Sequence, residues 1–376
     1  MRIALVIPTL NGGGAERVMS NMANYWESKG NEVVIITHDS EKKDFYSLNP
    51  GVTRYGFDIS KPPRHIWDTI KHNIQRITMP RKAIRTCRAD IVISFTNRTN
   101  IQTLAGLIET KVPVIVSERN NPTAQPLPPL WNILRKLLYP MASAVVVQTE
   151  AVKEWAVEFL SADKVFVIPN PVSPPSIQES ESELPSQLQR KKIVVAMGRL
   201  VHHKGFDLLI EAFSIAAGGR KDWSLMILGE GEDRTFLEDL ARSLSIRDQI
   251  IMPGRVCNIG QIMKKSDLFV LSSRHEGFPN VLLEAMASGL PVISTDCPFG
   301  PSEIIHDGID GMLVSNENIH EIALAMKHLM DDKKKRIRLG KEAKESSRRF
   351  SIEKIMNQWD HLISHTIENR LHHNRK

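Results

Sequence analysis

The sequence predicts an α/β protein of two domains, each a doubly wound parallel sheet covered by helices. Three observations lead to this prediction. A chain of 376 residues is long enough for two domains of roughly 150 residues each. Short apolar runs rich in β-branched residues alternate with helix-like stretches in both halves, which is typical of parallel strands buried on both faces. A segment rich in Pro, Ser and Glu, residues 173–190, separates the two series and predicts a linker.

Apolar runs predict the strands of each domain in order. In the first domain, residues 1–172, they lie at 2–10, 32–38, 90–95, 112–117, 144–148 and 165–168. In the second domain, residues 191–355, they lie at 193–197, 224–228, 249–252, 268–271 and 291–295. From about residue 321 onward the pattern is helical. We expect the last helix, 356–376, to rejoin the first domain and its basic, His-containing tail to be disordered.

The excess positive charge of the chain lies in its first half. Residues 1–172 hold 21 lysines and arginines against 15 acidic residues, whereas residues 173–376 hold 28 of each. A basic half attracts polyanions such as nucleic acid, anionic lipid or phosphorylated substrates. Three scattered cysteines, Cys87, Cys257 and Cys297, favour a reduced, cytoplasmic compartment over a disulfide framework.

No segment of the sequence predicts a leader or a membrane span. The apolar N-terminus is followed by a glycine-rich turn instead of a cleavage site. No apolar run approaches the ~18 to 20 residues of a transmembrane helix. We therefore expect a protein that is soluble or attached to a membrane surface at most.

The first strand is followed directly by Asn11 and three glycines, residues 12–14. Glycine lets the backbone approach a ligand closely, and the N–H groups at a helix start attract anions. The run lacks the G-x-G-x-x-G spacing of the dinucleotide fingerprint, and no P-loop motif occurs in the sequence. Taken alone, it indicates either an anion-binding loop or a plain tight turn.

Loops of the second domain carry charges and glycines at the predicted carboxyl ends of strands. Gly198 and Arg199 end its first strand, and Lys204 precedes a helix at 206–216. Two cations beside a helix start would clamp a diphosphate, although a solvated loop would also carry such charges. We expect the neighbouring His202 and His203 to be surface residues. Glycine-containing loops at 229–231 and 253–256 follow the next strands, where a doubly wound sheet binds ligands.

Two glutamates flank the start of a further predicted helix. Glu276 lies on the loop before it, and Glu284 lies within it, before its end at Gly289. Backbone N–H groups after Gly277 and Phe278 would be available to a phosphate. The alternative, two ordinary helix acids, is disfavoured by the Gly-Phe-Pro spacer.

Together these motifs resemble those of family 4 glycosyltransferases, which are retaining nucleotide-sugar enzymes with the two-domain GT-B fold. The resemblance covers nearly the whole chain. It depends on the glycine run 12–14, on Gly198, Arg199 and Lys204, and on the two glutamates separated by seven residues. The run 4–17, ending Gly-Gly-Ala-Glu-Arg, is similar to the branch that builds bacterial polysaccharides and lipid-linked oligosaccharides. That branch includes N-acetylgalactosaminyltransferases acting on undecaprenyl-diphosphate-linked glycans.

The resemblance implies a role for each motif residue. The implied catalytic residues are Arg199 and Lys204, which would hold the donor diphosphate and stabilise the leaving group, and Glu276, which would contact the donor sugar. Glu284 would accept hydrogen bonds from the ribose, and the backbone at 255–256 would meet the nucleobase. The full implied donor-binding set is Gly13, Gly14, Arg199, Lys204, Gly229, Gly254, Arg255, Val256, Glu276, Gly277, Phe278, Asn280, Leu283 and Glu284. The first domain would take the acceptor and the second the donor, across a cleft.

The resemblance also implies a mechanism and one departure from it. We expect a same-face displacement assisted by the leaving phosphate. The sequence has no Asp-x-Asp, so we expect no metal and no cofactor, with the cations stabilising the leaving diphosphate instead. Many relatives carry a histidine after the fifth strand, where Arg119 stands here, next to Glu118. These two residues would bind the acceptor or serve a structural role.

Residues 61–88 combine basic side chains with apolar residues at helical spacing. A basic amphipathic helix with an interfacial Trp is typical of attachment to an anionic membrane surface. The same cations could meet a polyprenyl diphosphate. Residues 130–139 are a second candidate, and plain packing on the sheet is the alternative for both. No RNA-binding motif or recognition helix occurs, so we expect no nucleic-acid partner. The implied membrane-binding residues are Arg64, Trp67, Lys71, Arg76, Arg81, Lys82 and Arg85.

The expected function is transfer of a hexosyl or N-acetylhexosaminyl group from a nucleotide sugar, with UDP-sugar preferred, to a lipid-linked glycan or oligosaccharide acceptor. We expect this at the cytoplasmic face of the cell membrane. Three alternatives stay open: a GDP-sugar donor, a nucleotide-sugar epimerase of the same fold, and a non-catalytic sugar-nucleotide-binding partner. A basic membrane face counts against an epimerase.

Overall fold

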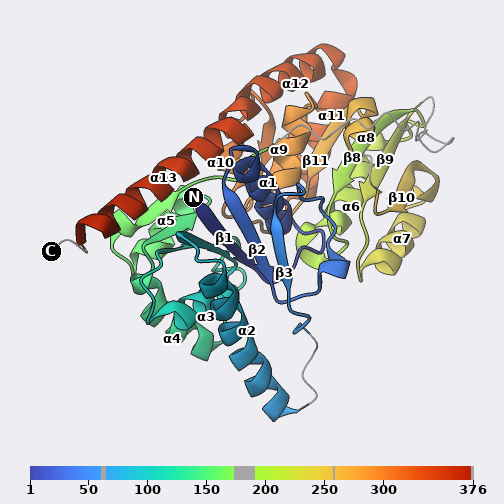
Figure 1. Cartoon of the computed structure of the whole chain (residues 1–376). Helices are drawn as coiled ribbons and strands as arrows, with labels where there is room; N and C mark the ends of the chain where they lie inside the picture. Colours follow the sequence, from blue (N-terminus) through green and yellow to red (C-terminus); the bar gives the residue numbers. More distant parts are fainter. Residues whose placement is uncertain (61–64, 173–190, 257–258, 374–376) are drawn as a thin grey trace. The chain divides into compact units, whose positions relative to one another are not determined.

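The structure, a computed structural model, describes residues 1–60, 65–172, 191–256 and 259–373. The chain divides into two compact units (Figure 1). Unit 1 comprises Met1–Pro171 and Glu353–Lys376, and unit 2 comprises Val172–Ile352. The predicted linker 173–190, Arg64 and Cys257 lie outside the described residues.

Unit 1 is built on a parallel sheet in the order β3-β2-β1-β4-β5-β6-β7. The strand order reverses between β1 and β4, and a doubly wound sheet binds ligands at the carboxyl ends of the strands at such a switch point. The strands are β1 (Arg2–Ile7), β2 (Glu32–Thr37), β3 (Thr53–Gly56), β4 (Ile91–Phe95), β5 (Val114–Ser117), β6 (Ala144–Val147) and β7 (Val165–Val167).

The six predicted strands of this unit are confirmed with shorter ends. β1 ends at Ile7 instead of residue 10, because Pro8 has no N–H to donate to a neighbouring strand. The sequence prediction missed β3. This strand is short and partly exposed at the sheet edge, so it carries no apolar run.

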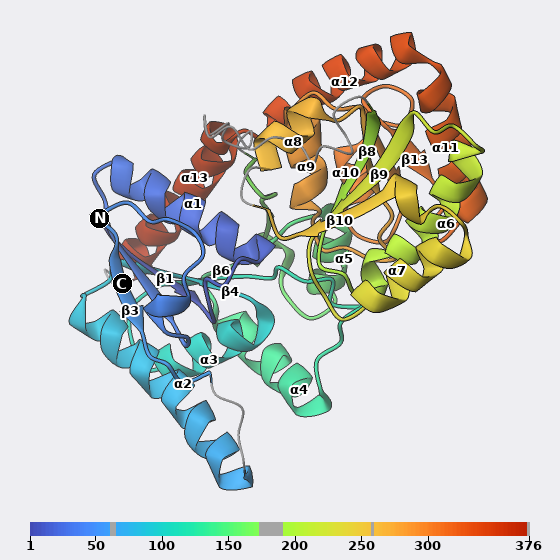
Figure 2. The same ribbon diagram turned by 90° about the vertical axis from the view of Figure 1, so that its right-hand side faces the viewer.

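Helices cover both faces of the unit 1 sheet. α2, α3 and α4 pack in sequence on one side, and α1 and α13 lie on the other (Figures 1 and 2). α13 completes the core, because Trp359 is fully buried with its ring edge-on to Trp26, and Trp26 Nε1 donates to Asp360 at 2.7 Å. The tail expected to be disordered is helical as far as His373. The helices are α1 (Gly14–Ser28), α2 (Ile66–Thr86), α3 (Asn97–Leu107), α4 (Pro129–Leu138), α5 (Glu150–Val157) and α13 (Ile352–His373).

Unit 2 repeats the plan with a parallel sheet in the order β10-β9-β8-β11-β12-β13, whose switch point lies between β8 and β11. The five predicted strands are confirmed, and β13 is an addition. The pairing of β10 with β9 shifts register between Ile251 and Gly254, because Pro253 interrupts the ladder. The strands are β8 (Lys192–Met197), β9 (Trp223–Leu228), β10 (Ile250–Gly254), β11 (Leu268–Leu271), β12 (Val292–Thr295) and β13 (Met312–Val314).

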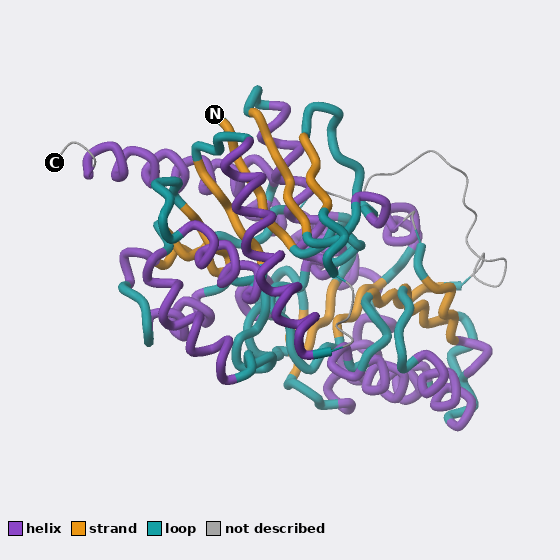
Figure 3. The backbone as a smooth tube through the Cα atoms, turned by 60° about the horizontal axis from the view of Figure 1, so that its bottom comes forward, coloured by secondary structure: helices purple, strands orange, loops and turns teal. Residues whose placement is uncertain are grey.

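Helices cover the unit 2 sheet from both sides, with the strands of each sheet running side by side (Figures 2 and 3). α6 and α11 pack against each other over a core that includes Leu209, Phe213 and Met326, all fully buried. The helices are α6 (Phe206–Ala217), α7 (Arg234–Ser243), α8 (Ile259–Lys265), α9 (Asn280–Ala287), α10 (Pro301–Ile304), α11 (Ile319–Asp331) and α12 (Lys333–Ser347).

Candidate functional site

The switch point of unit 2 brings together Lys204, from the loop after β8, and Glu276, from the loop after β11. Lys204 Nζ donates to Glu276 Oε1 at 2.7 Å, and Ser273 Oγ donates to the same oxygen at 2.6 Å. The two charged side chains are 21% and 9% exposed. The fold therefore holds a mostly buried ammonium against a carboxylate at the edge where parallel sheets bind ligands.

Arg274 ties the two loops together, a role that sequence reasoning missed. Its guanidinium donates to both carboxylate oxygens of Asp207, at 2.8 and 2.6 Å, and to the His202 carbonyl at 2.7 Å. Burial acts to raise the pKa of the Asp207 carboxyl, but the hydrogen bonds and charge of Arg274 lower it below its usual value. Arg274 lies inside the run that drew attention to Glu276. Its partners 67 and 72 residues away left no signal in the sequence.

His203 and His275 stack on each other beside this pair, with ring centroids 4.8 Å apart and planes 14° from parallel. His202 is exposed, as expected, whereas His203 is only partly exposed because its ring stacks on His275. Burial, with the charge of Lys204 and the neighbouring His275, lowers the pKa of His203 to about 4. The stacked imidazole is thus neutral at physiological pH, and Lys204 provides the positive charge beside it.

Two glycines after β9, Gly229 and Gly231, allow close packing of backbone against backbone. A Cβ at Gly229, where φ is +145°, would collide with the Gly198 carbonyl, and one at Gly231 would collide with the Leu200 carbonyl. The N–H of Gly198 donates to Leu228, and that of Gly229 donates to the Gly254 carbonyl. Gly229 and Gly254 belong to the predicted donor-binding set, and both have a positive φ, +145° and +88°. The structure adds a reason internal to the fold for their being glycine.

α9 positions the remaining predicted donor-site residues. Pro279 caps the helix, which starts at Asn280, and Gly289, with φ of +80°, closes it as expected. Glu284 is buried at 3% exposure within the helix. Leu283 is also buried, so only its backbone could reach a ligand. Gly277 lies before the helix on the same loop as Glu276.

The other predicted donor-site side chains differ in exposure. Phe278 packs edge-on against Phe350, with ring centroids 5.9 Å apart. Arg199 and Arg255 are exposed, and Val256 is partly exposed. Phe278 is therefore fixed by packing, whereas the two arginines extend from their loops into solvent.

In unit 1 the glycine run lies between β1 and α1 at the carboxyl end of the sheet. Gly12 adopts a φ of +86°, which a residue with a side chain rarely adopts. Gly13 precedes α1, and its carbonyl accepts a hydrogen bond from the Tyr46 hydroxyl at 3.1 Å. Gly14 is the first helical residue. The expected strand, glycine turn and helix start are therefore present.

Glu118 and Arg119 lie at the end of β5, and both are buried, at 1% and 7% exposure. Tyr139 donates its hydroxyl proton to Glu118 Oε2 at 3.0 Å, and Arg119 donates to the Asn170 side-chain oxygen. The guanidinium of Arg119 also stacks on Phe95, 3.8 Å from the ring centroid. Contact of these two residues with an acceptor stays a prediction, and their burial indicates a structural part for both.

Burial also shifts the pKa values of both side chains. It raises the pKa of the Glu118 carboxyl to about 7, against the opposing effects of the Arg135 charge and the Tyr139 hydrogen bond. Burial likewise lowers the pKa of Arg119 to about 9. The protein therefore holds a carboxyl that titrates near neutral pH inside unit 1.

The basic helix predicted at 61–88 corresponds to α2 and carries an exposed apolar stripe. Trp67, Ile70 and Ile74 are 76%, 45% and 54% exposed. Lys71, Lys82 and Arg85 are also exposed, whereas Arg81 pairs with Glu109 at 2.9 Å and Arg76 donates to the Ile59 carbonyl. A solvent-open groove along this helix is lined by Thr78, Arg81, Lys82, Arg85 and Thr86.

α4, the second candidate segment, exposes a comparable stripe. Leu130, Ile133 and Leu137 are 66%, 57% and 64% exposed, at spacings of three and four residues. Lys136 is exposed beside them. None of the helices in the described residues is both long and apolar enough to cross a membrane.

Two family models match the chain and together cover most of it. The model for Glycosyltransferase Family 4 matches residues 12–174, and the model for Glycosyl transferases group 1 matches residues 178–346. A relative from Campylobacter jejuni is 31% identical over 97% of this chain and 98% of its own length. That relative is named GalNAc-alpha-(1->4)-GalNAc-alpha-(1->3)-diNAcBac-PP-undecaprenol alpha-1,4-N-acetyl-D-galactosaminyltransferase.

Solved structures show the same fold at low sequence identity. Sucrose-phosphate synthase from Thermosynechococcus elongatus matches with a TM-score of 0.82 at 18% identity, over 98% of this chain and 99% of that one. Anabaena HepE in complex with UDP and glucose matches with a TM-score of 0.77 at 18% identity, over 97% and 99%.

Proposed function

Since the chain belongs to the family 4, group 1 glycosyltransferases and has their GT-B fold, we propose that it transfers a hexosyl or N-acetylhexosaminyl group from a UDP-sugar to a lipid-linked glycan. The reaction would serve bacterial surface polysaccharide or glycan assembly. The Campylobacter relative is named for a transfer onto an undecaprenol-diphosphate-linked glycan, which supports this choice of acceptor class.

The observation that carries the proposal is the Lys204–Glu276 pair at the unit 2 switch point. The Lys204 ammonium has three N–H groups and donates one of them to Glu276. The remaining N–H groups would bind a donor diphosphate, and exposed Arg199 would bind it from the same loop. Glu276 would keep Lys204 in position and bind hydroxyls of the donor sugar. Buried Glu284 would meet the ribose.

The proposed step is a same-face displacement that retains the anomeric configuration. The bond from the sugar C1 to the diphosphate oxygen breaks, and a bond from C1 to the acceptor oxygen forms. The acceptor hydroxyl proton passes to the departing diphosphate oxygen. Negative charge gathers on the diphosphate in the transition state, where Lys204 and Arg199 stabilise it without a metal. Removing one comparable fixed donor from an enzyme typically costs ~3 to 4 kcal/mol of transition-state stabilisation.

The exposed stripes on α2 and α4 support a proposal that unit 1 attaches to the cytoplasmic face of the membrane. Each stripe presents large apolar side chains to solvent next to exposed cations. Each Lys or Arg near an anionic surface contributes about 1 kcal/mol to binding. Attachment there would bring the active site to a lipid-linked acceptor, and the groove on α2 could meet its diphosphate.

The test is calorimetric titration of the protein with UDP, GDP and ADP, each with and without EDTA. We expect UDP to bind most tightly and EDTA to leave its affinity unchanged. Tighter binding of GDP would indicate a GDP-sugar donor instead of a UDP-sugar donor. Loss of UDP binding in EDTA would contradict a metal-independent site. If UDP binds, incubation with UDP-sugars separates the enzyme classes, because an epimerase would convert the free UDP-sugar without any acceptor. A non-catalytic partner would bind UDP-sugar and turn over nothing.

A further inference from the structure

We propose that the loops after β1 and β2 form a subsite for an uncharged pyranose ring of the acceptor glycan. Phe45 would stack on the ring, and Asn11 and Lys43 would bind its hydroxyls. The inference rests on the proposed function, because a glycan acceptor is bound only if the protein is a transferase. It is independent of the predicted acceptor residues Glu118 and Arg119.

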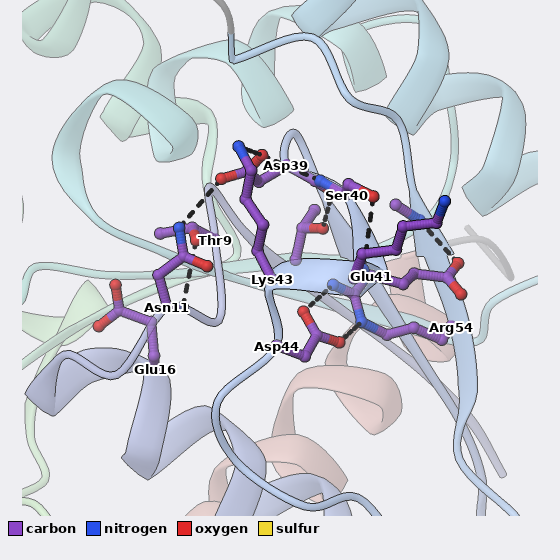
Figure 4. A network of polar contacts seen from close by, with 12 residues as sticks. Thr9, Asn11, Glu16, Asp39, Ser40, Glu41, Lys43, Asp44 and Arg54 are labelled. Atoms are coloured by element: carbon purple, nitrogen blue, oxygen red, sulfur yellow. Dashed lines mark hydrogen bonds and ion pairs between the residues drawn. The ribbon is translucent and has the colours of Figure 1, made fainter.

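A buried carboxylate organises the polar side of this subsite (Figure 4). The Asp39 side chain, 7% exposed, accepts hydrogen bonds from Asn11 Nδ2 at 3.1 Å, from Lys43 Nζ at 2.8 Å and from the Ser40 N–H at 3.0 Å. Burial acts to raise the pKa of Asp39, but these hydrogen bonds lower it below its usual value. Asp39 is therefore a fixed anion that orients Asn11 and Lys43.

The groups that Asp39 orients keep further hydrogen-bonding capacity toward solvent. Lys43 is 54% exposed and has N–H groups beyond the one that it donates to Asp39. Asn11 is also exposed, and its amide nitrogen is bound to Asp39, which leaves its amide oxygen to accept. A sugar hydroxyl both donates and accepts, so this pair offers the two complementary groups in fixed positions.

Phe45 is an exposed aromatic ring that the fold nevertheless holds in place. It is 56% exposed, yet its N–H donates to the Leu10 carbonyl at 3.0 Å. Its ring stands edge-on to Tyr46, with centroids 5.2 Å apart, and Tyr46 is anchored to Gly13. The ring also packs over Gly12, where an added Cβ would lie 3.2 Å from Phe45 Cγ.

A rigid exposed ring of this kind suits a carbohydrate. A pyranose has a face of C–H groups that packs on an aromatic ring while its hydroxyls meet polar groups at the edge. Because the ring is already fixed, binding loses little side-chain entropy. The N–H of Phe45 donates to the carbonyl of Leu10, which is next to Asn11. The aromatic and polar parts of the subsite therefore lie on adjoining chain segments.

The charge of this surface favours a neutral ligand. Residues 39–54 contain three acids and three cations, which are Asp39, Glu41, Asp44, Lys42, Lys43 and Arg54. Arg54 donates to both oxygens of Asp44, at 2.8 and 2.7 Å, so the two opposite charges neutralise each other (Figure 4). The balanced surface contrasts with the basic α2. It fits a sugar ring better than a phosphate or a carboxylate.

The experiment is saturation-transfer NMR on full-length protein saturated with UDP. The probes are the methyl α-glycosides of glucose, galactose, N-acetylglucosamine and N-acetylgalactosamine, with methyl α-glucuronide as the charged comparison. We expect at least one glycoside to bind the wild type. Phe45→Ala should weaken that binding at least about tenfold, and Lys43→Met and Asn11→Ala should weaken it too. The matched control is Phe236→Ala, because Phe236 lies on α7 in unit 2 and is also 56% exposed. UDP affinity, measured in parallel, should be the same in all variants.

Three results would overturn the inference. They are unchanged glycoside binding by Phe45→Ala, absence of glycoside binding by a wild type that binds UDP, and preferential binding of methyl α-glucuronide. Failure of the proposed function has different signatures: the wild type does not bind nucleotide, converts free UDP-sugar without an acceptor, or binds UDP-sugar and turns over nothing. Lys43→Met alters an exposed side chain and provides a folded second variant if Phe45→Ala proves unstable.

Discussion

The oxygen Oε1 of Glu276 accepts two hydrogen bonds, from the Lys204 ammonium and from the Ser273 hydroxyl. Ser273 is itself fixed, because its carbonyl accepts from Thr295 Oγ1 at 2.6 Å. Residues at the ends of three strands, β8, β11 and β12, thus fix one carboxylate. A group held this firmly can stabilise a developing charge without reorganising, which is the property that electrostatic catalysis needs.

Replacing this carboxylate should separate chemistry from nucleotide binding. We expect Glu276→Ala to lower kcat ~100- to 1000-fold, because it removes a sugar contact and releases Lys204. UDP affinity should change much less than kcat, because Lys204 keeps its charge for the diphosphate and Glu276 itself is assigned to the sugar. Steady-state kinetics and calorimetry measure the two quantities, with exposed Glu345→Ala as control. A loss of UDP affinity as large as the loss of kcat would indicate that Glu276 contacts the nucleotide and not the sugar.

The buried carboxyl of Glu118 should make stability depend on pH. The pKa of this carboxyl is 4.5 in the unfolded chain and about 7 in the folded protein. Folding therefore takes up a proton between these values. Stability that is present below pH 4.5 is lost as pH rises toward 7, by about 3 kcal/mol at most.

Glu118→Gln removes this titration and keeps an oxygen for the Tyr139 hydroxyl. We expect its melting temperature, relative to wild type, to increase as the pH rises through the interval between 4.5 and about 7. Thermal melts across that interval measure the difference, with exposed Glu158→Gln as control. Parallel melting curves for wild type and variant at every pH would refute the assignment.

Single residues were predictable where a motif marked them and unpredictable where a distant partner defined them. Lys204 stood out as a cation just before a predicted helix, and Glu276 stood out because seven residues separate it from Glu284. Arg274 and the stack of His203 on His275 did not, since each depends on a contact between chain segments about 70 residues apart. Donor contact by Gly229 stays a prediction, and its close approach to the Gly198 carbonyl is a separate reason for glycine that no sequence pattern shows.

At the scale of elements, α4 departs from an ordinary sheet-covering helix. Such a helix turns its apolar stripe toward the core, whereas α4 presents Leu130, Ile133 and Leu137 to solvent. Arg135, by contrast, is buried in the fold and stacks on Trp155, 4.5 Å from the ring centroid. The usual placement of apolar side chains inside and charged side chains outside is therefore partly reversed in α4, which is consistent with a binding partner on its outer face.

Changing that outer face should release the protein from membranes without unfolding it. We expect the triple variant Leu130→Ser, Ile133→Ser, Leu137→Ser to lose most of its binding to phosphatidylglycerol-containing vesicles, because burial of each such side chain contributes ~1.5 to 3 kcal/mol. Vesicle co-sedimentation measures this. The matched control is Leu324→Ser with Ile337→Ser, since these unit 2 residues are 66% and 64% exposed. Equal binding of the triple variant and the wild type to vesicles would show that α4 has only a structural role.

Strands were predicted well where they carry a buried apolar run and missed where they do not. Strands such as β1, β4 and β8 are apolar on both faces, which is a strong signal. β3 and β13 are short edge strands with partly exposed residues, and they have no such pattern. Strand ends were overestimated where apolar residues continue past the ladder, as they do after Pro8.

For the whole molecule, the prediction of two doubly wound parallel sheets is confirmed, and each sheet has its switch point between its first and fourth strands. Alternation of buried strands with helices is a property of the entire chain, so errors at single elements do not change it. The site could be predicted only as far as the loops that follow the strands. The contacts that shape each loop come from chain segments that no local pattern connects.

The placement of α13 has a consequence for how the protein is made. Trp359 fills the interior of unit 1 against Trp26 and Phe95, yet it is synthesised after all of unit 2. The strands of unit 1 therefore emerge from the ribosome long before Trp359, which completes their core, is translated. Unit 2 is contiguous and can fold as soon as it emerges. During translation, the first half of the chain must wait with an apolar surface uncovered, which makes it the half most in need of chaperones.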